Sequence, residues 1–451
     1  MSIPRIAFIA FGLAGCSNPP HAGPDAPVVG ADATSDGRSG VLTIKAVQNP
    51  DLDILFLIDD SPSMADKQNN LKLAFPSFEA ALQGIAGGLP NLHIGVATSD
   101  MGTKGSAVLT PGPAIGGGPG GCSGTGKNGV LQANGVTLSH GNYLEALRGG
   151  SQNFTGDLPT AFSAIASVGQ AGCGFEQHLA GVRAALNENA ANTGFLRDSA
   201  NLAVIVLADE DDCSALDPAV FQVDPATYGP LNSFRCFRFG VTCDQDSGTD
   251  GDKTGCHASS TSPVIEDVAP FQQFLLGLKH GDARKLLLGA IVAPATPATV
   301  EERALGGTQP LVTQIAHSCN YTDGNGQLEV GDPAVRLTQL VSGFPGRHFA
   351  SSVCQALQSP AAELGAQVAG LVGDGCLEQT IATPVDCVVE DISDAAPSAP
   401  VNVPSCGAGV TGDCYTLTAD NTCTVGAPLR LSVTRAAPAG DDVWTTVRCT
   451  R

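Results

Sequence analysis

Four stretches of the sequence are apolar throughout, and segments with the periodicity of amphipathic helices separate them. Because these stretches do not alternate apolar with polar positions, each predicts a strand that is covered on both faces. Strands that alternate with helices indicate a parallel sheet wrapped by helices on both sides, so the pattern predicts an α/β fold. The four predicted strands are residues 53–59, 92–100, 201–209 and 285–293.

The helical segments show the spacing of a single buried face. In the first of them Leu71, Phe75 and Phe78 are four and three residues apart, which places them on one side of a helix. Pro76 lies inside this segment, and we expect it to kink or split the helix. Further helices are expected at residues 158–169, 175–186, 268–281 and 332–344, and after Cys354.

Aspartates end three of the predicted strands, at Asp59, Asp100 and Asp209. The carboxyl ends of parallel strands meet at one edge of the sheet, where ligands bind in such folds. Ser61 and Ser63 follow the first of these aspartates. Carboxylate and hydroxyl oxygens are ligands that hard cations prefer, so this edge predicts a cation site in outline. A helix N-cap is the alternative role for Asp59 and Ser61.

The helical pattern stops near residue 375. Residues 376–451 hold six cysteines and short alternating runs punctuated by Pro and Gly. We expect a small β domain here, stabilised by disulfides because its core is small. The α/β domain is placed at residues 46–375, with a cysteine-rich insertion at 210–262.

The N-terminus has the layout of an export signal. Arg5 precedes a short apolar run, and residues 1–15 are predicted to be a signal peptide. Residues 13–16, Leu-Ala-Gly-Cys, resemble the lipobox of bacterial lipoproteins, which implies that Cys16 carries the lipid. The alternative is an ordinary secretory signal with a chance cysteine. Residues 16–45 are rich in Pro, Gly, Ala and Asp and predict a flexible tether.

This N-terminus predicts a location in the bacterial cell envelope. The acyl chains that the lipobox implies make a stable membrane anchor. Ser17 after the lipidated cysteine favours the outer membrane over the inner membrane. We therefore expect a folded protein that is attached to a membrane only through its lipid.

The chain has 15 cysteines, so 14 remain beyond Cys16. In an exported chain an even set predicts disulfides, although their pairing is not readable from sequence. A zinc site is the alternative, but it needs closely spaced ligands, and the shortest spacing here is Cys236 to Cys243. The disulfide candidates are Cys122, Cys173, Cys213, Cys236, Cys243, Cys256, Cys319, Cys354, Cys376, Cys387, Cys406, Cys414, Cys423 and Cys449.

Charge and motifs exclude several classes of partner. The net charge of −21 argues against nucleic acid, whose phosphates need a basic surface, and is compatible with divalent cations. Residues 121–128 are one position short of a phosphate-binding loop, because Asn128 stands where Ser or Thr is needed. A glycine-rich stretch precedes it instead of an apolar strand, so we expect no nucleotide.

The acidic run at residues 209–212 raises the possibility of a metal-dependent hydrolase. Such sites usually add histidines, and the eight histidines here show no paired spacing. The sequence also lacks a GxSxG nucleophile motif. We therefore expect no enzymatic activity.

The Asp59-x-Ser61-x-Ser63 pattern after a buried strand resembles the metal-ion-dependent adhesion site of von Willebrand factor A domains. The order of elements up to Asp209 agrees with this family over roughly residues 50–375. More narrowly, the chain resembles secreted bacterial lipoproteins that carry such a domain. The resemblance implies a parallel-sheet sandwich with bound Mg²⁺, or Mn²⁺ or Ca²⁺. Ser61 and Ser63 would bind the cation directly, Asp59 and Asp209 mostly through water, and a partner's carboxylate would complete the coordination.

One position departs from the family pattern. The loop before residue 175 lacks the threonine of the family, and Glu176 stands nearby as its replacement. A carboxylate there adds negative charge, tightens metal binding and weakens the attraction of the cation for an acidic partner. The alternative is a degenerate site that binds no metal.

The sequence thus predicts a lipid-anchored envelope protein that binds a protein or peptide partner through a metal site. An acidic residue of the partner would contact the metal. Two alternatives belong to other classes. The domain is a metal-free scaffold, or it is a metal-dependent hydrolase that uses the acidic run at 209–212.

Overall fold

The computed structural model describes residues 40–45 and 49–450, except for gaps at 86–87, 188, 305–309, 323–325, 374, 376, 378–380, 382–384, 394, 408, 421–428, 438 and 440–442. The predicted signal peptide, Cys16 and most of the predicted tether lie outside the described residues, as do Cys376 and Cys423. In the part of the chain that the structure describes, we find no helix long and apolar enough to cross a membrane.

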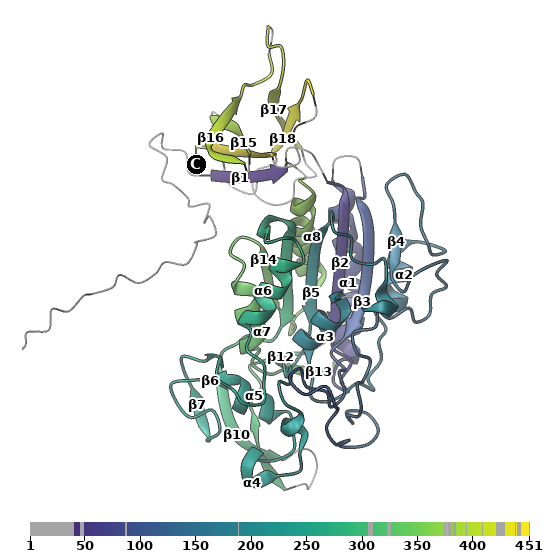
Figure 1. Ribbon diagram of the computed structural model, residues 1–451, viewed down its shortest axis with the longest axis vertical. Coiled ribbons are helices and arrows are strands. Elements are labelled where there is room, and N and C mark those ends of the chain that lie inside the picture. Colours follow the sequence, from purple (N-terminus) through teal and green to yellow (C-terminus); the bar gives the residue numbers. More distant parts are fainter. Residues whose placement is uncertain are drawn as a thin grey trace, which may run out of the picture.

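A six-stranded sheet forms the centre of the molecule (Figure 1), in the order β14-β9-β5-β2-β3-β4. All neighbours are parallel except the short edge strand β4, which is antiparallel to β3. The four predicted strands are all present, which confirms the α/β prediction. The strands are β2 (Asp51–Ile58), β3 (Asn91–Thr98), β4 (Leu144–Ala146), β5 (Asn201–Leu207), β9 (Leu286–Val292) and β14 (His348–Ser352).

Helices cover both faces of this sheet. On one face lie α1 (Ala65–Gln83), α2 (Leu158–Ile165) and α8 (Gln358–Val372), and on the other lie α3 (His178–Leu186), α6 (Ala269–Gly277) and α7 (Val335–Ser342). The residues of β2 alternate between the two cores because successive side chains of a strand point to opposite faces. Ile54 and Phe56 therefore join the first core, while Leu55 and Leu57 join the second.

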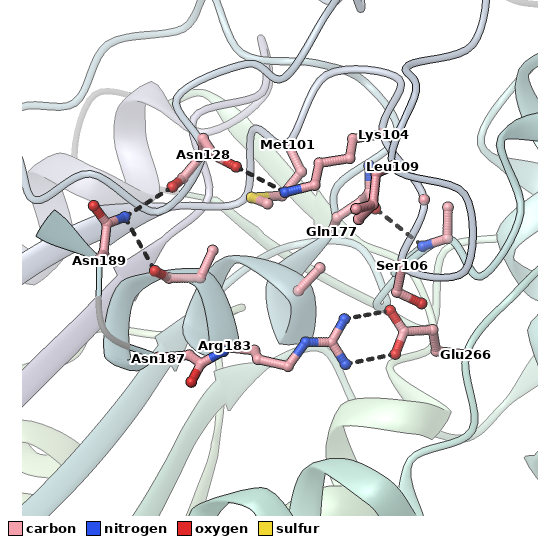
Figure 2. Close-up of a pocket in the computed structure, with 14 residues that line it drawn as sticks. Met101, Lys104, Ser106, Leu109, Asn128, Gln177, Arg183, Asn187, Asn189 and Glu266 are labelled. Carbon is pink, nitrogen blue, oxygen red and sulfur yellow. Dashed lines mark hydrogen bonds and ion pairs between the residues drawn. The ribbon is translucent and has the colours of Figure 1, made fainter.

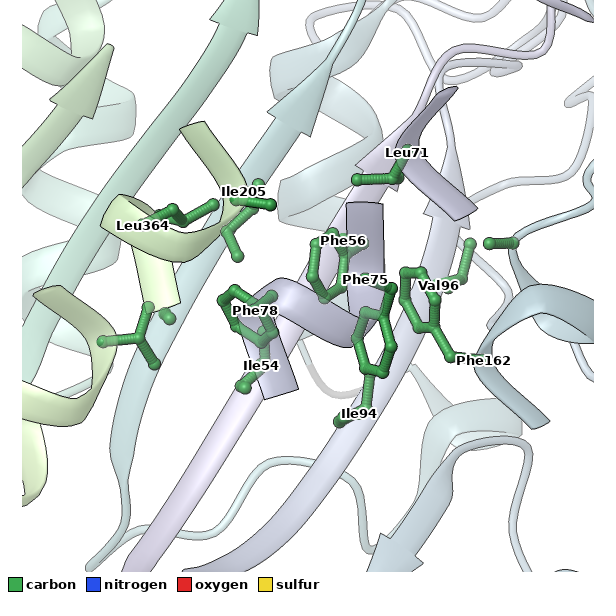
Figure 3. Close-up of a cluster of buried hydrophobic side chains, with 14 of the residues drawn as sticks. Ile54, Phe56, Leu71, Phe75, Phe78, Ile94, Val96, Phe162, Ile205 and Leu364 are labelled. Carbon is green, nitrogen blue, oxygen red and sulfur yellow. The ribbon is translucent and has the colours of Figure 1, made fainter. Parts of the chain in front are cut away.

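Aromatic rings fill the centre of the first core (Figure 3). The ring of Phe56 lies edge-on to Phe162 of α2, which is stacked on Phe75 of α1. Pro76 does not split the helix, since α1 is continuous through this residue, so that part of the prediction is wrong; the predicted kink stays a prediction. The aromatic contacts of Phe75 and Phe78 on either side of Pro76 hold the helix against the sheet.

Residues after the fourth main strand and within the insertion add small elements beyond the main sheet. Three strands form a sheet in the order β11-β10-β7, and two further pairs are β12-β13 and β6-β8. The elements are α4 (Pro225–Tyr228), α5 (Phe234–Gly240), β6 (Val241–Thr242), β7 (Gly251–Lys253), β8 (His257–Ala258), β10 (Ala298–Ala304), β11 (Leu311–Ile315), β12 (Cys319–Thr322) and β13 (Leu328–Gly331), with short 3₁₀ helices at Ala190–Asn192, Pro218–Phe221 and Ala283–Lys285.

The C-terminal part is a β unit, as predicted, but it includes a strand from the N-terminus. Strand β1 (Gly40–Lys45) pairs with β19 along its whole length. The prediction of a tether through residue 45 is therefore wrong for these residues, because the segment GVLTIK has the apolar and β-branched composition of a strand. The other strands are β15 (Cys387–Ser393), β16 (Ala396–Val403), β17 (Cys414–Ala419), β18 (Leu429–Thr434) and β19 (Val443–Cys449).

The C-terminal β unit lies at the opposite end of the main sheet from β12 and β13 (Figure 1). The guanidinium of Arg284 lies 3.6 Å from the ring centre of Trp444, and Arg430 donates to the carbonyl oxygen of Gly84 at 3.1 Å. These contacts join the β unit to the α/β domain.

Six disulfides lie within the described residues, which confirms the disulfide prediction for twelve of the candidate cysteines. Four belong to the α/β domain and its insertion, and two to the β unit. Such a set is typical of chains that fold outside the cytoplasm. The pairs are Cys122–Cys173, Cys213–Cys236, Cys243–Cys256, Cys319–Cys354, Cys387–Cys449 and Cys406–Cys414.

Candidate metal centre

The loop after β2 brings a carboxylate and two hydroxyls together. Asp59 is fully buried, and its Oδ1 accepts hydrogen bonds from the backbone N–H of Ser61 at 2.8 Å and from the Ser99 hydroxyl at 3.1 Å. Its Oδ2 accepts from the Ser61 hydroxyl at 3.2 Å, and that hydroxyl lies 3.2 Å from the hydroxyl of Ser63. The three oxygen-bearing side chains therefore converge, and Ser63 is exposed to solvent.

Asp209 comes to the same point from the neighbouring strand. Ile58 at the end of β2 pairs with Leu207 at the end of β5, so the two loops leave the sheet side by side. The carboxyl group of Asp209 interacts with the Ser63 hydroxyl and with the charge of Asp59. Burial and the Asp59 carboxylate raise the pKa of Asp209 to about 6.

Glu176 lies just before α3, close enough to feel the charges of Asp59 and Asp209. Burial and then the neighbouring carboxylate of Glu210 raise the pKa of Glu176 well above its ordinary value. Two buried oxygens in this group, Asp209 Oδ1 and Glu176 Oε2, have no hydrogen-bond partner among the described residues. Buried carboxylate oxygens without a donor are costly, and either a proton or a bound cation would relieve this cost.

The donor set fits a hard divalent cation such as Mg²⁺, which takes oxygen ligands and retains several waters. Within the described residues no group of three or more His, Cys, Asp or Glu side chains lies at metal-binding distance. Two of the converging side chains here are serines, so such a group is not required. The structure thus places Asp59, Ser61, Ser63 and Asp209 together, with Glu176 beside them.

Three polar side chains near this point had not been identified from sequence. The ammonium of Lys67 lies 3.0 Å from Asp209 Oδ2 and 2.6 Å from Glu329 Oε2, and it donates to the carbonyl oxygen of Ser63 at 3.0 Å. The Nε2 atom of His178, which is fully buried, lies 3.9 Å from Asp59 Oδ2. The sequence gives a weak indication that Lys67 belongs to the site, because it lies four residues after Ser63. It gives no such indication for Glu329, which lies on the distant strand β13.

Two of the three remaining acidic residues of the run at 209–212, Asp211 and Asp212, have structural partners. Asp211 accepts hydrogen bonds from the backbone N–H groups of Arg336 and Leu337 at the start of α7. Asp212 pairs with the Arg336 guanidinium at 2.9 Å. These contacts hold both carboxyl groups against α7.

Lys127, in the segment that resembles a phosphate-binding loop, is likewise engaged within the protein. Its ammonium lies 2.6 Å from Asp60 Oδ2 and donates to the carbonyl oxygen of Val168 at 3.1 Å. It therefore serves as the counter-ion of a buried aspartate.

A separate cavity of about 560 Å³ opens beside α3 (Figure 2). Arg183 forms a two-point ion pair with Glu266, at 2.7 and 2.6 Å, and Lys104 donates to the Asn128 amide oxygen at 3.2 Å. The charged groups of its wall are thus already paired within the protein. A cavity of about 360 Å³ lies instead at Lys67 and Glu329, next to the candidate metal centre.

No protein-family profile matches the sequence, and no curated protein is similar to it at a significant level. Solved structures with a similar arrangement include a conserved hypothetical protein, BatB, from Bacteroides thetaiotaomicron, with 9% identity, a TM-score of 0.29, and coverage of 71% of this chain and 98% of that chain. The pilus adhesin SpaC from Lactobacillus rhamnosus GG has 13% identity and a TM-score of 0.32, over 92% of this chain and 42% of that chain. A von Willebrand factor type A protein from Catenulispora acidiphila has 11% identity and a TM-score of 0.29, over 92% of this chain and 66% of that chain.

The fold assignment follows from the sheet itself. A parallel sheet with one short antiparallel edge strand, helices on both faces and the DxSxS loop at the end of β2 define an A-type α/β domain. Residues 51–372 therefore have the von Willebrand factor A fold that the sequence resemblance implied, and a disulfide-bonded β unit accompanies them.

The buried carboxyl groups predict how stability depends on pH when divalent cations are removed. Burial raises the pKa of Asp60, Asp209 and Asp211 from 3.8 to about 6. Because the folded chain takes up these protons at higher pH than the unfolded chain, its stability rises as pH falls from about 7 to about 5, by on the order of 1 kcal/mol or more. Urea denaturation in EDTA at both pH values measures this change in the free energy of unfolding. A lower stability at pH 5 would contradict it.

Proposed function

We propose that this protein is a lipid-anchored component of the bacterial cell envelope that binds a protein or peptide partner through a divalent-cation site. The observation that carries the proposal is the convergence of Asp59, Ser61 and Ser63 with Asp209, whose buried Oδ1 has no donor. The disulfides support a location outside the cytoplasm. Lipid attachment at Cys16 is part of the proposal.

The side chains of the chain itself prepare the site. The Ser61 N–H and the Ser99 hydroxyl fix Asp59 Oδ1, so that the carboxylate keeps one orientation at the end of β2. Ser61 and Ser63 offer hydroxyl oxygens, and the exposure of Ser63 leaves the site open to a partner. A bound Mg²⁺, Mn²⁺ or Ca²⁺ would supply an electrophilic centre for a carboxylate of the partner.

Isothermal titration of the purified chain with Mg²⁺ and Mn²⁺ tests this proposal. We expect the chain to bind one ion, and the variant Asp59→Ala/Asp209→Ala to bind at least about 100-fold more weakly, because two of its carboxylates are gone. The matched control is Asp244→Ala/Asp246→Ala, which removes two carboxylates from an exposed loop, and we expect its affinity to be unchanged.

The outcomes separate the proposal from its alternatives. Equal affinity in the unchanged chain and in the Asp59→Ala/Asp209→Ala variant would refute the site. Binding of a partner that is insensitive to EDTA would favour a metal-free scaffold. Hydrolysis in an activity screen with Mg²⁺, Mn²⁺ and Ca²⁺ would favour an enzyme.

A further inference from the structure

We propose that Lys67 is a built-in counter-ion of the candidate metal centre. Its charge sets the affinity of the site for divalent cations and the preference of the site for acidic ligands. In the free protein, the carboxylate of Glu329 occupies the position beside Lys67. This inference rests on the proposed function and deepens it. It assigns roles to two residues that the resemblance to von Willebrand factor A domains does not include.

The position of Lys67 is fixed by its contacts. Its side chain is 4% exposed, and its three N–H donors face three oxygens, those of Asp209 Oδ2, Glu329 Oε2 and the Ser63 carbonyl. An ammonium group that is satisfied by three oxygens at 2.6 to 3.0 Å is held in one geometry. Lys67 is therefore part of the site and does not move freely in solvent.

Lys67 also determines which oxygen of Asp209 is left for a cation. It occupies Oδ2, whereas Oδ1 is buried and has no hydrogen-bond partner in the part of the chain that the structure describes. The backbone adds a second restraint, because the N–H of Asp332 donates to the carbonyl oxygen of Asp209 at 2.7 Å. Asp209 thus presents one free oxygen in a fixed direction.

The charge of Lys67 offsets the carboxylate that replaces the threonine of the family pattern. When a divalent cation displaces the protons of Asp209 and Glu176, these two carboxylates and Asp59 together would carry more negative charge than the cation neutralises. A cation surrounded by excess negative charge attracts a further carboxylate poorly. The positive charge of Lys67 beside Asp209 removes this excess, and the loaded site can accept an acidic group.

Glu329 is the internal competitor for that acidic group. It lies on β13, is 12% exposed, and faces the cavity of about 360 Å³ that Lys67 also lines. The Cys319–Cys354 disulfide ties the hairpin that carries Glu329 to the segment after β14. A carboxylate that enters from the cavity meets Lys67 at the position that Glu329 occupies.

Titration with Mn²⁺ alone tests the charge argument, because the side chains of Lys67 and Glu329 carry opposite charges and their removal should change Mn²⁺ affinity in opposite directions. We expect Lys67→Met to bind Mn²⁺ at least about tenfold more tightly than the unchanged chain, and Glu329→Gln to bind severalfold more weakly. Lys67→Gln provides a second variant that keeps a hydrogen-bond donor. Lys72→Met, which removes an ammonium from the same helix where it contacts only the Ser167 hydroxyl, is the matched control and should change affinity less than about twofold.

Acetate tests the preference for acidic ligands in the Mn²⁺-loaded protein. Displacement of metal-bound water by acetate lowers the relaxation rate of water protons, and the midpoint of this change reports acetate affinity. We expect Glu329→Gln to respond at severalfold lower acetate concentration than the unchanged chain, and Lys67→Met at severalfold higher concentration. Unchanged midpoints in both variants would overturn the role in ligand preference.

The metal titration distinguishes failure of this inference from failure of the proposed function. If the unchanged chain binds Mn²⁺ and Lys67→Met binds it equally or more weakly, Lys67 is not a counter-ion, although the metal site stands. Binding by Lys67→Met but not by the unchanged chain would support the counter-ion and contradict a metal site in the natural protein. Absence of binding in every variant would overturn both.

Discussion

Replacing Arg336 with methionine will lower the free energy of unfolding by about 3–5 kcal/mol, because it removes the ion-pair partner of the buried Asp212 carboxylate. The guanidinium of Arg336 is fully buried and contacts Asp212 Oδ2 at 2.9 Å. It also donates to the carbonyl oxygens of Gly240 at 3.2 Å and Glu266 at 2.7 Å. Each of these acceptors loses its guanidinium donor in the variant, although the N–H of Ser214 still donates to Asp212 Oδ2.

The position of this pair explains why the effect is large. Asp212 Oδ1 accepts from the backbone N–H of Leu179 in α3 at 2.9 Å, while Arg336 belongs to α7. The pair therefore joins two helices to the loop that follows β5. Urea denaturation followed by helical circular dichroism measures the change.

A surface arginine supplies the control for this experiment. Arg303→Met removes a partly exposed ion pair with Glu301 at 3.3 Å and should cost no more than about 1 kcal/mol. Equal losses in the two variants would show that burial of the Asp212 charge is not the cause.

Replacing Phe162 with alanine will lower the free energy of unfolding by about 3–5 kcal/mol, because it opens a cavity in the largest core. The side chain of Phe162 is fully buried. Its ring centre lies 3.8 Å from that of Phe75 in a stacked arrangement and 4.9 Å from that of Phe56 (Figure 3). The change therefore removes contacts between α2, α1 and the central strand β2.

Phe162→Leu is the matched control for this core variant. It retains most of the side-chain volume, and we expect it to cost less than about 1.5 kcal/mol. The same urea experiment applies, followed by helical circular dichroism, since the single tryptophan, Trp444, lies in the β unit. A loss for Phe162→Ala no larger than for Phe162→Leu would mean that the core closes around the missing ring.

The main sheet, and the edge that carries the candidate metal centre, could be predicted because the strands are apolar throughout. A run such as residues 53–59 allows few structures other than a covered strand, and the parallel order then brings Asp59 and Asp209 to one edge. The predicted split of the helix at Pro76 is wrong because packing outweighed the local preference of proline. The aromatic contacts of Phe75 and Phe78 favour an unbroken helix.

The features that sequence did not predict depend on contacts between distant segments. Glu329 reaches Lys67 only because the β12–β13 hairpin folds back against the end of β5. Strand β1 is stabilised by pairing with β19, almost the whole length of the chain away. Disulfide pairing is of the same kind, since spacing alone does not say that Cys319 meets Cys354.

The pairing of β1 with β19 has a mechanical consequence. The chain belongs to the β unit as β1 (Gly40–Lys45) and to the α/β domain as β2 (Asp51–Ile58), which ends one residue before Asp59. If a partner binds at Asp59 as proposed, a pull on it is transmitted first to β2. Because β2 is bonded to β3 and β5 along its length, the load is shared as shear across the sheet. The insertion and its disulfides are not part of β2, β3 or β5, so a change in their shape would leave this load-sharing intact.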